Sequence, residues 1–381
     1  MRPFEKYPVL AELLRPFRAS QRRTLGLVIA ALSEATAARS MEIATLLASW
    51  LDVRLDSALN RFYRLLRNPR ILDMDLTQQM LGLLSKKLGR TLIISIDWTE
   101  WREPLRMLVA AVVSDRRAIP VHAAAFDKHK ISRSQNASEN TFLRTLSSLL
   151  KKCGLKAIIL CDRGFRRVTW LALLQRLELS FVVRLMDDVL VEREGDKRFR
   201  KRALSKMGLQ PGQAIDLGRV ALREDGFTTV RVIGVWAAGA KEPWWLATSL
   251  ESSVTQVVAY YDRRMTIEEQ FRDTKGCRFG LKLVWTQFKN PDHLSRFALL
   301  LGVGILVWTI SGVAAVNAKP SLRMVHPTKG PRQSFVTIGM RALRSGTLAL
   351  RVTVAAVLRF LPKPKLRRFA WLKTAPAPAL L

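Results

Sequence analysis

The chain has 381 residues, of which 63 are lysine or arginine and 31 are aspartate or glutamate, so its formal net charge is +32. Hydrophobic residues make up 49% of the sequence, which is typical of a folded globular protein and excludes a disordered or collagen-like chain. The length allows roughly two to three domains and needs no disulfide or metal to stabilise a core. So positive a surface favours a polyanionic partner, and we expect nucleic acid rather than an anionic membrane.

Cysteine and histidine are too scarce for a disulfide framework or a zinc site built from these residues. The three cysteines, Cys153, Cys161 and Cys277, are odd in number and form no CxxC pair, and the four histidines are scattered. This usage is typical of a protein from a reducing compartment.

Residues 1–88 are basic, and their apolar positions have a helical period. We predict one helix over 41–51, capped by Ser40, and a second helix that ends at residue 66 and is capped by Asp56. The N-terminus has no apolar core of the signal-peptide type.

A basic helix that follows another helix after a short turn is typical of a helix-turn-helix DNA-binding domain. In that interpretation Arg61 and Arg64 point outward and contact DNA. The alternative is an ordinary helical hairpin with a solvated basic face, because the turn lacks a diagnostic glycine.

From about residue 90 the pattern changes to strands. Two continuous apolar runs, 91–96 and 156–161, end at Asp97 and Asp162, and such runs predict central strands that are covered on both faces. The other elements expected before residue 187 are a hairpin of strands 105–113 and 118–126, helices over 139–150 and 167–177, and a strand over 180–185.

We predict that residues 89–186 and 251–290 form one α/β catalytic core, which a β-rich insertion at 187–250 interrupts. A helix is expected from 254 to about 275, and a helical basic region over 291–381. The strands expected in the insertion are 189–191, 214–217, 229–236 and 244–248.

The segment 297–318 carries no charge and is long enough to cross a bilayer. Three glycines and several polar residues, among them Thr309 and Asn317, interrupt it, and no second such segment follows. We therefore predict a buried core helix and no membrane partner.

Asp97 and Asp162 both follow apolar strands, where sheets of this kind place their ligands. Either aspartate alone is better explained as a turn or helix cap. Together with Glu268 on a later helix, they form the set of hard oxygen ligands that two divalent metals need for phosphoryl transfer. In a basic protein, such a site would act on the nucleic-acid backbone.

The later helix also carries a spaced motif, Y-x2-R-x3-E-x6-K. It resembles the signature of bacterial insertion-sequence transposases of the DDE class, in the YREK group of the insertion sequence 4 family. The blocks SIDWT and CDRGF resemble the family's aspartate motifs. The residues that carry the resemblance are Tyr261, Arg264, Glu268 and Lys275 with the blocks 95–99 and 161–165.

This resemblance implies a ribonuclease-H-like mixed sheet with flanking helices, interrupted by the β-rich insertion. It implies catalysis by Asp97, Asp162 and Glu268 with two Mg²⁺ ions, for which Mn²⁺ can substitute. The expected reaction nicks double-stranded DNA at the terminal inverted repeats, forms a hairpin, and joins the ends to target DNA. A homodimer in the synaptic complex and a bacterial cytoplasmic location follow from the same resemblance.

The resemblance also implies that Tyr261, Arg264 and Lys275 grip terminal phosphates, and that a tryptophan of the insertion stacks on a flipped base. Counting back from Thr248 selects Trp244 for that role, while the alternative is that Trp244 or its neighbour belongs to the core of the insertion. Base stacking of this kind contributes roughly 1–3 kcal/mol.

If residues 254–275 form one continuous α-helix, the four motif residues share one stripe and Glu269 lies outside it. We therefore expect Glu268, and not Glu269, to be the third carboxylate. Two other functions remain open: a transposase-derived DNA-binding protein without catalysis, and a ribonuclease-H-fold nuclease that does not join strands.

Overall fold

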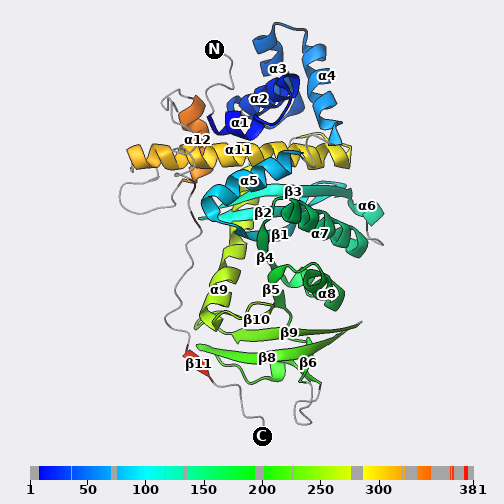
Figure 1. Ribbon diagram of the computed structural model, residues 1–381, viewed down its shortest axis with the longest axis vertical. Coiled ribbons are helices and arrows are strands. Elements are labelled where there is room, and N and C mark those ends of the chain that lie inside the picture. The colour runs from blue at the N-terminus through cyan, green and yellow to red at the C-terminus, as the bar shows by residue number, and fades with distance from the viewer. Residues whose placement is uncertain are drawn as a thin grey trace.

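The computed structural model describes residues 8–35, 37–69, 75–115, 117–131, 135–193, 201–224, 226–275, 286–319, 321, 333–344, 361, 363 and 373–375. One long sheet runs through the molecule, with the N-terminal helices at one end and the strands of residues 190–248 at the other (Figure 1). Cys277 and most of the region after residue 344 lie outside the described residues.

The sheet is mixed, and its strand order is β3-β2-β1-β4-β5-β10-β9-β8-β6-β7, with β11 paired to β8. The central strands β1, β4 and β5 are parallel, and the other pairs on that path are antiparallel. The strands are β1 Thr91–Arg102, β2 Leu105–Ser114, β3 Arg117–Asp127, β4 Lys156–Cys161, β5 Ser180–Leu185, β6 Leu190–Glu192, β7 Arg202–Ala203, β8 Gln213–Glu224, β9 Gly226–Val235, β10 Trp244–Thr248 and β11 Lys373–Ala375.

Helices cover both faces of the central strands. The helices are α1 Pro8–Leu14, α2 Ala19–Glu34, α3 Ser40–Leu51, α4 Leu55–Leu66, α5 Thr77–Leu88, α6 Lys128–Ile131, α7 Gln135–Lys152, α8 Val168–Arg176, α9 Val254–Asp262, α10 Thr266–Lys275, α11 Pro291–Ala318 and α12 Phe335–Arg344. This mixed α/β architecture agrees with the fold class expected from the sequence.

The continuous apolar runs are explained by burial on both faces of the sheet. In β4, Ile158 and Leu160 pack in the cluster that contains α9, whereas Ile159 and Cys161 pack in the cluster that contains α7 and α8. Side chains alternate along a strand, so each face needs its own apolar set and no polar residue is tolerated between them.

Three local expectations were wrong. Asp97 does not follow its strand but lies within β1, because β2 continues to pair with β1 after the parallel pairing with β4 ends at Ile96. Ser40 is the first residue of α3 and makes no cap, and α4 begins before Asp56. The helix expected over 254–275 is interrupted by a 3-10 turn at Arg263–Met265.

The strands expected in the β-rich insertion are present, but they continue the central sheet. β10 pairs with β5 on one side and with β9 on the other, so the insertion extends the same hydrogen-bonded sheet. Its position in the sheet brings β10 next to a strand of the core, which places residues of the insertion beside α9.

The long apolar helix α11 is a core helix, as predicted. It is the one described helix long and apolar enough to cross a membrane, and 89% of its most apolar window is buried inside the protein. It lies between the N-terminal helices and the sheet (Figure 1), and a helix enclosed by protein on all sides is apolar all round.

Glycines mark the close approaches of α11. A Cβ at Gly302 would lie 2.2 Å from the carbonyl oxygen of Pro120 in β3, and one at Gly312 would lie 1.9 Å from that of Phe335 in α12. On its other side, the indole Nε1 of Trp308 donates to Ser33 Oγ of α2 at 2.9 Å. Gly302 and Gly312 therefore allow the close packing of α11 against β3 and α12.

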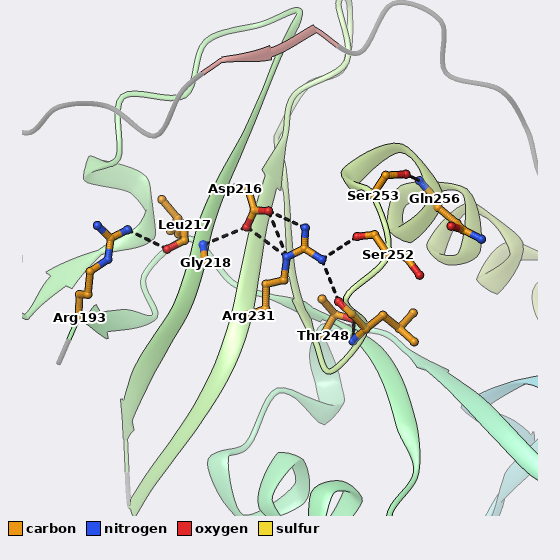
Figure 2. Close-up of polar contacts among 10 residues, drawn as sticks. Arg193, Asp216, Leu217, Gly218, Arg231, Thr248, Ser252, Ser253 and Gln256 are labelled. Carbon is orange, nitrogen blue, oxygen red and sulfur yellow. Dashed lines mark hydrogen bonds and ion pairs between the residues drawn. The ribbon is translucent and has the colours of Figure 1, made fainter.

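A buried arginine fastens the insertion to the start of α9 (Figure 2). The guanidinium of Arg231 in β9 contacts Asp216 Oδ2 at 2.6 Å and donates to the carbonyl oxygens of Leu250 and Ser252 at 2.9 and 2.7 Å. Ser253 then caps α9, because its side chain accepts from the Gln256 N–H. The position of α9 is thus tied to Asp216, which lies where the register of β8 with β9 shifts at a β-bulge.

Replacing Arg231 by alanine should lower the free energy of unfolding by roughly 2–3 kcal/mol, because it leaves Asp216 and two carbonyls without this donor. Arg219→Ala is the matched control, since its contact with Glu251 is 3.8 Å long and both side chains are mostly exposed. Its effect should stay within about 0.5 kcal/mol. Denaturant unfolding measures both, and equal losses would contradict the proposed clamp.

Candidate active site

The register between β1 and β4 brings the two aspartates together. Ile96 pairs with Cys161, so Asp97 and Asp162 occupy the next positions on neighbouring parallel strands. Each has the same parity as residues that face α9, such as Ser95 and Leu160, and both side chains therefore point to the face that carries α9 and α10.

The ionised form of Asp97 is destabilised by its surroundings. Its side chain is only 16% exposed, and burial together with the charge of Asp162 raises its pKa to about 7. Glu268 raises the pKa further, whereas Arg264 and the Trp98 N–H, which donates to Asp97 Oδ1 at 2.8 Å, lower it. The site therefore concentrates more negative charge than its own cation compensates.

Asp162 begins a tight turn at the end of β4. Its Oδ1 accepts the backbone N–H of Gly164 at 2.9 Å, so it caps the 3-10 helix Arg163–Phe165. The cap that the sequence suggested as an alternative role is thus present. It uses one carboxylate oxygen and does not turn the side chain away from Asp97, whose pKa it raises.

Arg264 joins the third carboxylate to the first. Its guanidinium contacts Asp97 Oδ2 at 3.3 Å and Glu268 Oε1 at 2.8 Å, and its side chain is 11% exposed. The Nε atom of Arg264 is buried and has no hydrogen-bond partner among the described residues. Glu269 points elsewhere, because it pairs with Arg117 of β3 at 2.5 Å.

Tyr261 and Trp244 lie against each other beside this cluster. Their rings meet edge to face with centroids 5.1 Å apart, and burial raises the pKa of Tyr261 to about 12. Trp244 is only partly buried, whereas Trp245 is a core residue with an exposed fraction of 2%. Of the two tryptophans, Trp244 has the ring that borders the site.

The remaining residues predicted to contact DNA lie in two separate parts of the molecule. Lys275 ends α10, and the pKa of its amine is lowered by burial although Asp97 and Glu100 act to raise it, so it lies within electrostatic range of the cluster. Arg61 and Arg64 lie on α4, at the far end of the molecule from the insertion, with Arg64 exposed and Arg61 half-buried (Figure 1).

The donor chemistry of the three carboxylates suits a divalent cation, whose charge would offset the burial and the carboxylate repulsion that raise the pKa of Asp97. However, no three acidic, histidine or cysteine side chains of the described residues converge closely enough to hold a metal ion. The guanidinium of Arg264 lies between Asp97 and Glu268, and Glu268 has to leave it before it can join the aspartates.

Polar residues behind the aspartates are a part of the site that the motifs do not indicate. Glu139 of α7 is buried and contacts both the indole of Trp98 and the guanidinium of Arg167. A signal was available, because Glu139 precedes Phe142, Leu143 and Leu146 at helical spacing and therefore lies on the apolar stripe of its helix.

Because the ionised form of Asp97 is destabilised, Asp97→Asn should raise the free energy of unfolding of the metal-free protein at pH 8, on the order of 2–3 kcal/mol. Between the ordinary pKa of 3.8 and the folded value of about 7, the folded state binds a proton that the unfolded state lacks. Stability is therefore lost as pH rises through that window, and the asparagine variant escapes this loss.

Unfolding in the presence of a chelator at pH 8 and near pH 4 measures the effect, which should shrink at the lower pH. Asp188→Asn, at an exposed position, is the control and should change neither value. A destabilised Asp97→Asn protein at pH 8 would show that the carboxylate is a net stabilising group.

Comparison with known proteins agrees with this geometry. A family model described as a transposase DDE domain matches residues 89–300, which is more than half of the chain and contains all three carboxylates. A search of curated proteins found no match. The chain therefore belongs to the family of DDE-domain transposases, enzymes that cleave DNA and transfer strands.

Proposed function

We propose that the protein is the transposase of an insertion sequence, in the YREK group of the insertion sequence 4 family, and that it cleaves the ends of its element and joins them to target DNA. The observation that carries the proposal is the meeting of Asp97 and Asp162 on adjacent strands beneath Arg264 and Glu268. The spacing of Tyr261 and Lys275 on the same segment supports the assignment to this group.

Asp97, Asp162 and Glu268 are the proposed ligands of two divalent cations, Mg²⁺ or Mn²⁺. When bound, such ions activate the attacking oxygen and stabilise the leaving one. Arg264 would release Glu268 as a DNA phosphate takes the guanidinium, and its unpaired buried Nε supports such a transfer, because the group has a donor left to offer.

The proposed reaction has four steps at this one site. Water attacks a phosphodiester at the element's end and breaks the P–O3′ bond, which leaves a 3′-hydroxyl. That hydroxyl attacks a phosphodiester of the opposite strand, displaces the 3′-hydroxyl of the flanking DNA, and gives a hairpin on the element end. Opening of the hairpin by water restores the 3′-hydroxyl, which then attacks a phosphodiester of the target DNA and displaces a target 3′-hydroxyl.

The DNA would be held by cationic and aromatic groups around the carboxylates. Arg264 and Lys275 are suited to terminal phosphates, and the buried Tyr261 hydroxyl is a donor that stays protonated at neutral pH. The edge of Trp244 against Tyr261 supports a stacking role for the partly buried ring, whereas the core position of Trp245 does not.

The α3–α4 unit is proposed as the DNA-reading domain, with Arg61 and Arg64 toward the duplex. The short turn between the helices and the basic side of α4 support this assignment. A homodimer that pairs the two ends of the element, and a location in the bacterial cytoplasm, complete the proposal.

Glu268→Gln should reduce nicking and strand transfer on the order of 10³-fold or more, because the amide cannot serve as an anionic ligand. Glu269→Gln should keep most of both activities, since Glu269 is engaged with Arg117. The assay is cleavage of the element's own ends with Mg²⁺, with hairpin products resolved on a denaturing gel.

Binding of the same ends without metal should be unchanged in Glu268→Gln, Asp97→Ala and Asp162→Ala. The reverse ranking of Glu268 and Glu269 would move the third ligand by one residue. Cleavage without hairpin or joined products would favour a nuclease, and binding without cleavage by the wild type would favour a DNA-binding protein.

Affinity for the element's ends should fall by about a thousandfold or more between about 50 and 200 mM salt, as expected for six or more phosphate contacts. Arg64→Gln should lower the slope of log affinity against log salt by about one. Lys206→Gln is the control, because that exposed lysine lies in the insertion, far from α4. A nearly flat dependence would contradict broad phosphate contact.

A further inference from the structure

A buried glutamate on the opposite face of the sheet connects the two aspartates. The side chain of Glu139 in α7 is 2% exposed, and both of its oxygens are used. Oε1 accepts from Trp98 Nε1 and Gln135 Nε2, each at 2.8 Å, and Oε2 pairs with the guanidinium of Arg167. Burying a carboxylate costs free energy. A complete set of hydrogen-bond and ion-pair partners around it therefore indicates a role that an apolar residue at this position would not fill.

One branch of this network leads to Asp97. Trp98 is its neighbour in β1, and the backbone N–H of Trp98 donates to Asp97 Oδ1 at 2.8 Å. The Trp98 ring is held from two sides, by the hydrogen bond to Glu139 and by the guanidinium of Arg106, 4.3 Å from the ring centre. Fixing the indole therefore fixes the N–H that orients the Asp97 carboxylate.

The second branch leads to Asp162. Arg167 immediately precedes α8 and ends the short connection that Asp162 begins by capping Gly164. Because Glu139 holds the guanidinium of Arg167, it anchors the far end of that connection. A single carboxylate thus links the segments that carry both aspartates.

We infer that Glu139 is a positioning residue, which sets the spacing of Asp97 and Asp162 through Trp98 and Arg167. The inference rests on the proposed function, since it concerns the geometry of the same two carboxylates. Glu139 itself touches neither the DNA nor a cation, because both of its oxygens are occupied on the far side of the sheet. Groups that orient a ligating residue typically contribute about 10–100-fold to affinity or rate.

The test compares Glu139→Gln with Trp98→Phe. The amide can still accept from Trp98 but loses the ion pair with Arg167, and the phenyl ring loses the indole donor. Each variant should lower the single-turnover cleavage rate at saturating end DNA by about 10–100-fold. Each should also raise the Mn²⁺ concentration needed to shift the Tm of the protein without DNA, while the Kd for end DNA without metal stays unchanged.

Ser33→Ala is the matched control, because it removes the partner of another buried indole, that of Trp308, far from the aspartates. It can lower the Tm but should leave the cleavage rate and the Mn²⁺ requirement at their wild-type values. The double variant should be slower than either single variant, because Glu139→Gln weakens the branch that leads to Asp162 and Trp98→Phe weakens the branch that leads to Asp97.

Wild-type rate and Mn²⁺ requirement in both folded variants would overturn the inference. A loss of cleavage as complete as that of Asp97→Ala would overturn it too, because it exceeds what a positioning residue contributes. If Glu139→Gln does not fold, Trp98→Phe carries the same test alone. Failure of the wild type to cleave its ends would instead refute the proposed function.

Discussion

The parallel pairing of β1 with β4 is the constraint on which the site depends. Ile96 lies opposite Cys161, so the chain delivers Asp97 and Asp162 side by side on one face. A slip of β4 by one residue would turn Asp162, and every apolar side chain of that strand, to the wrong face. The two apolar clusters that cover the sheet therefore hold the register of the site as well as the fold.

That register has an electrostatic cost. Asp97 is mostly buried and lies next to a second carboxylate, and burial first, with repulsion from Asp162 second, raises its pKa to about 7. Arg264 compensates part of this charge from within the protein. The arrangement stabilises the fold less than an apolar pair would, which is the usual sign of a site kept for chemistry.

The sequence predicts this structure well wherever one physical effect dominates. The bounds of β4 and β5 follow from their apolar runs, because strands buried on both faces are mainly apolar. Prediction failed where contacts with residues distant in the sequence determine the structure. Pairing with β2 extends β1 past Asp97. The tight turn at 263–265 divides a helix that helix propensity alone would continue. Glu139 was missed because an acidic residue on an apolar stripe is explained only by the partners that it meets after folding.

The helical segment that carries Arg264 and Glu268 is anchored at both ends. Arg231 ties the loop before α9 to the insertion, and Arg117 of β3 contacts Asp273 and Glu269 of α10, at 2.8 and 2.5 Å. Between these anchors the 3-10 turn at 263–265 holds Arg264 over the aspartates. A helix held in this way has little room to slide, so an approach of Glu268 to Asp97 has to come from rotation of the two side chains. The transfer of the Arg264 guanidinium from the Glu268 carboxylate to a DNA phosphate would then be a local side-chain movement that does not require the rest of the fold to move.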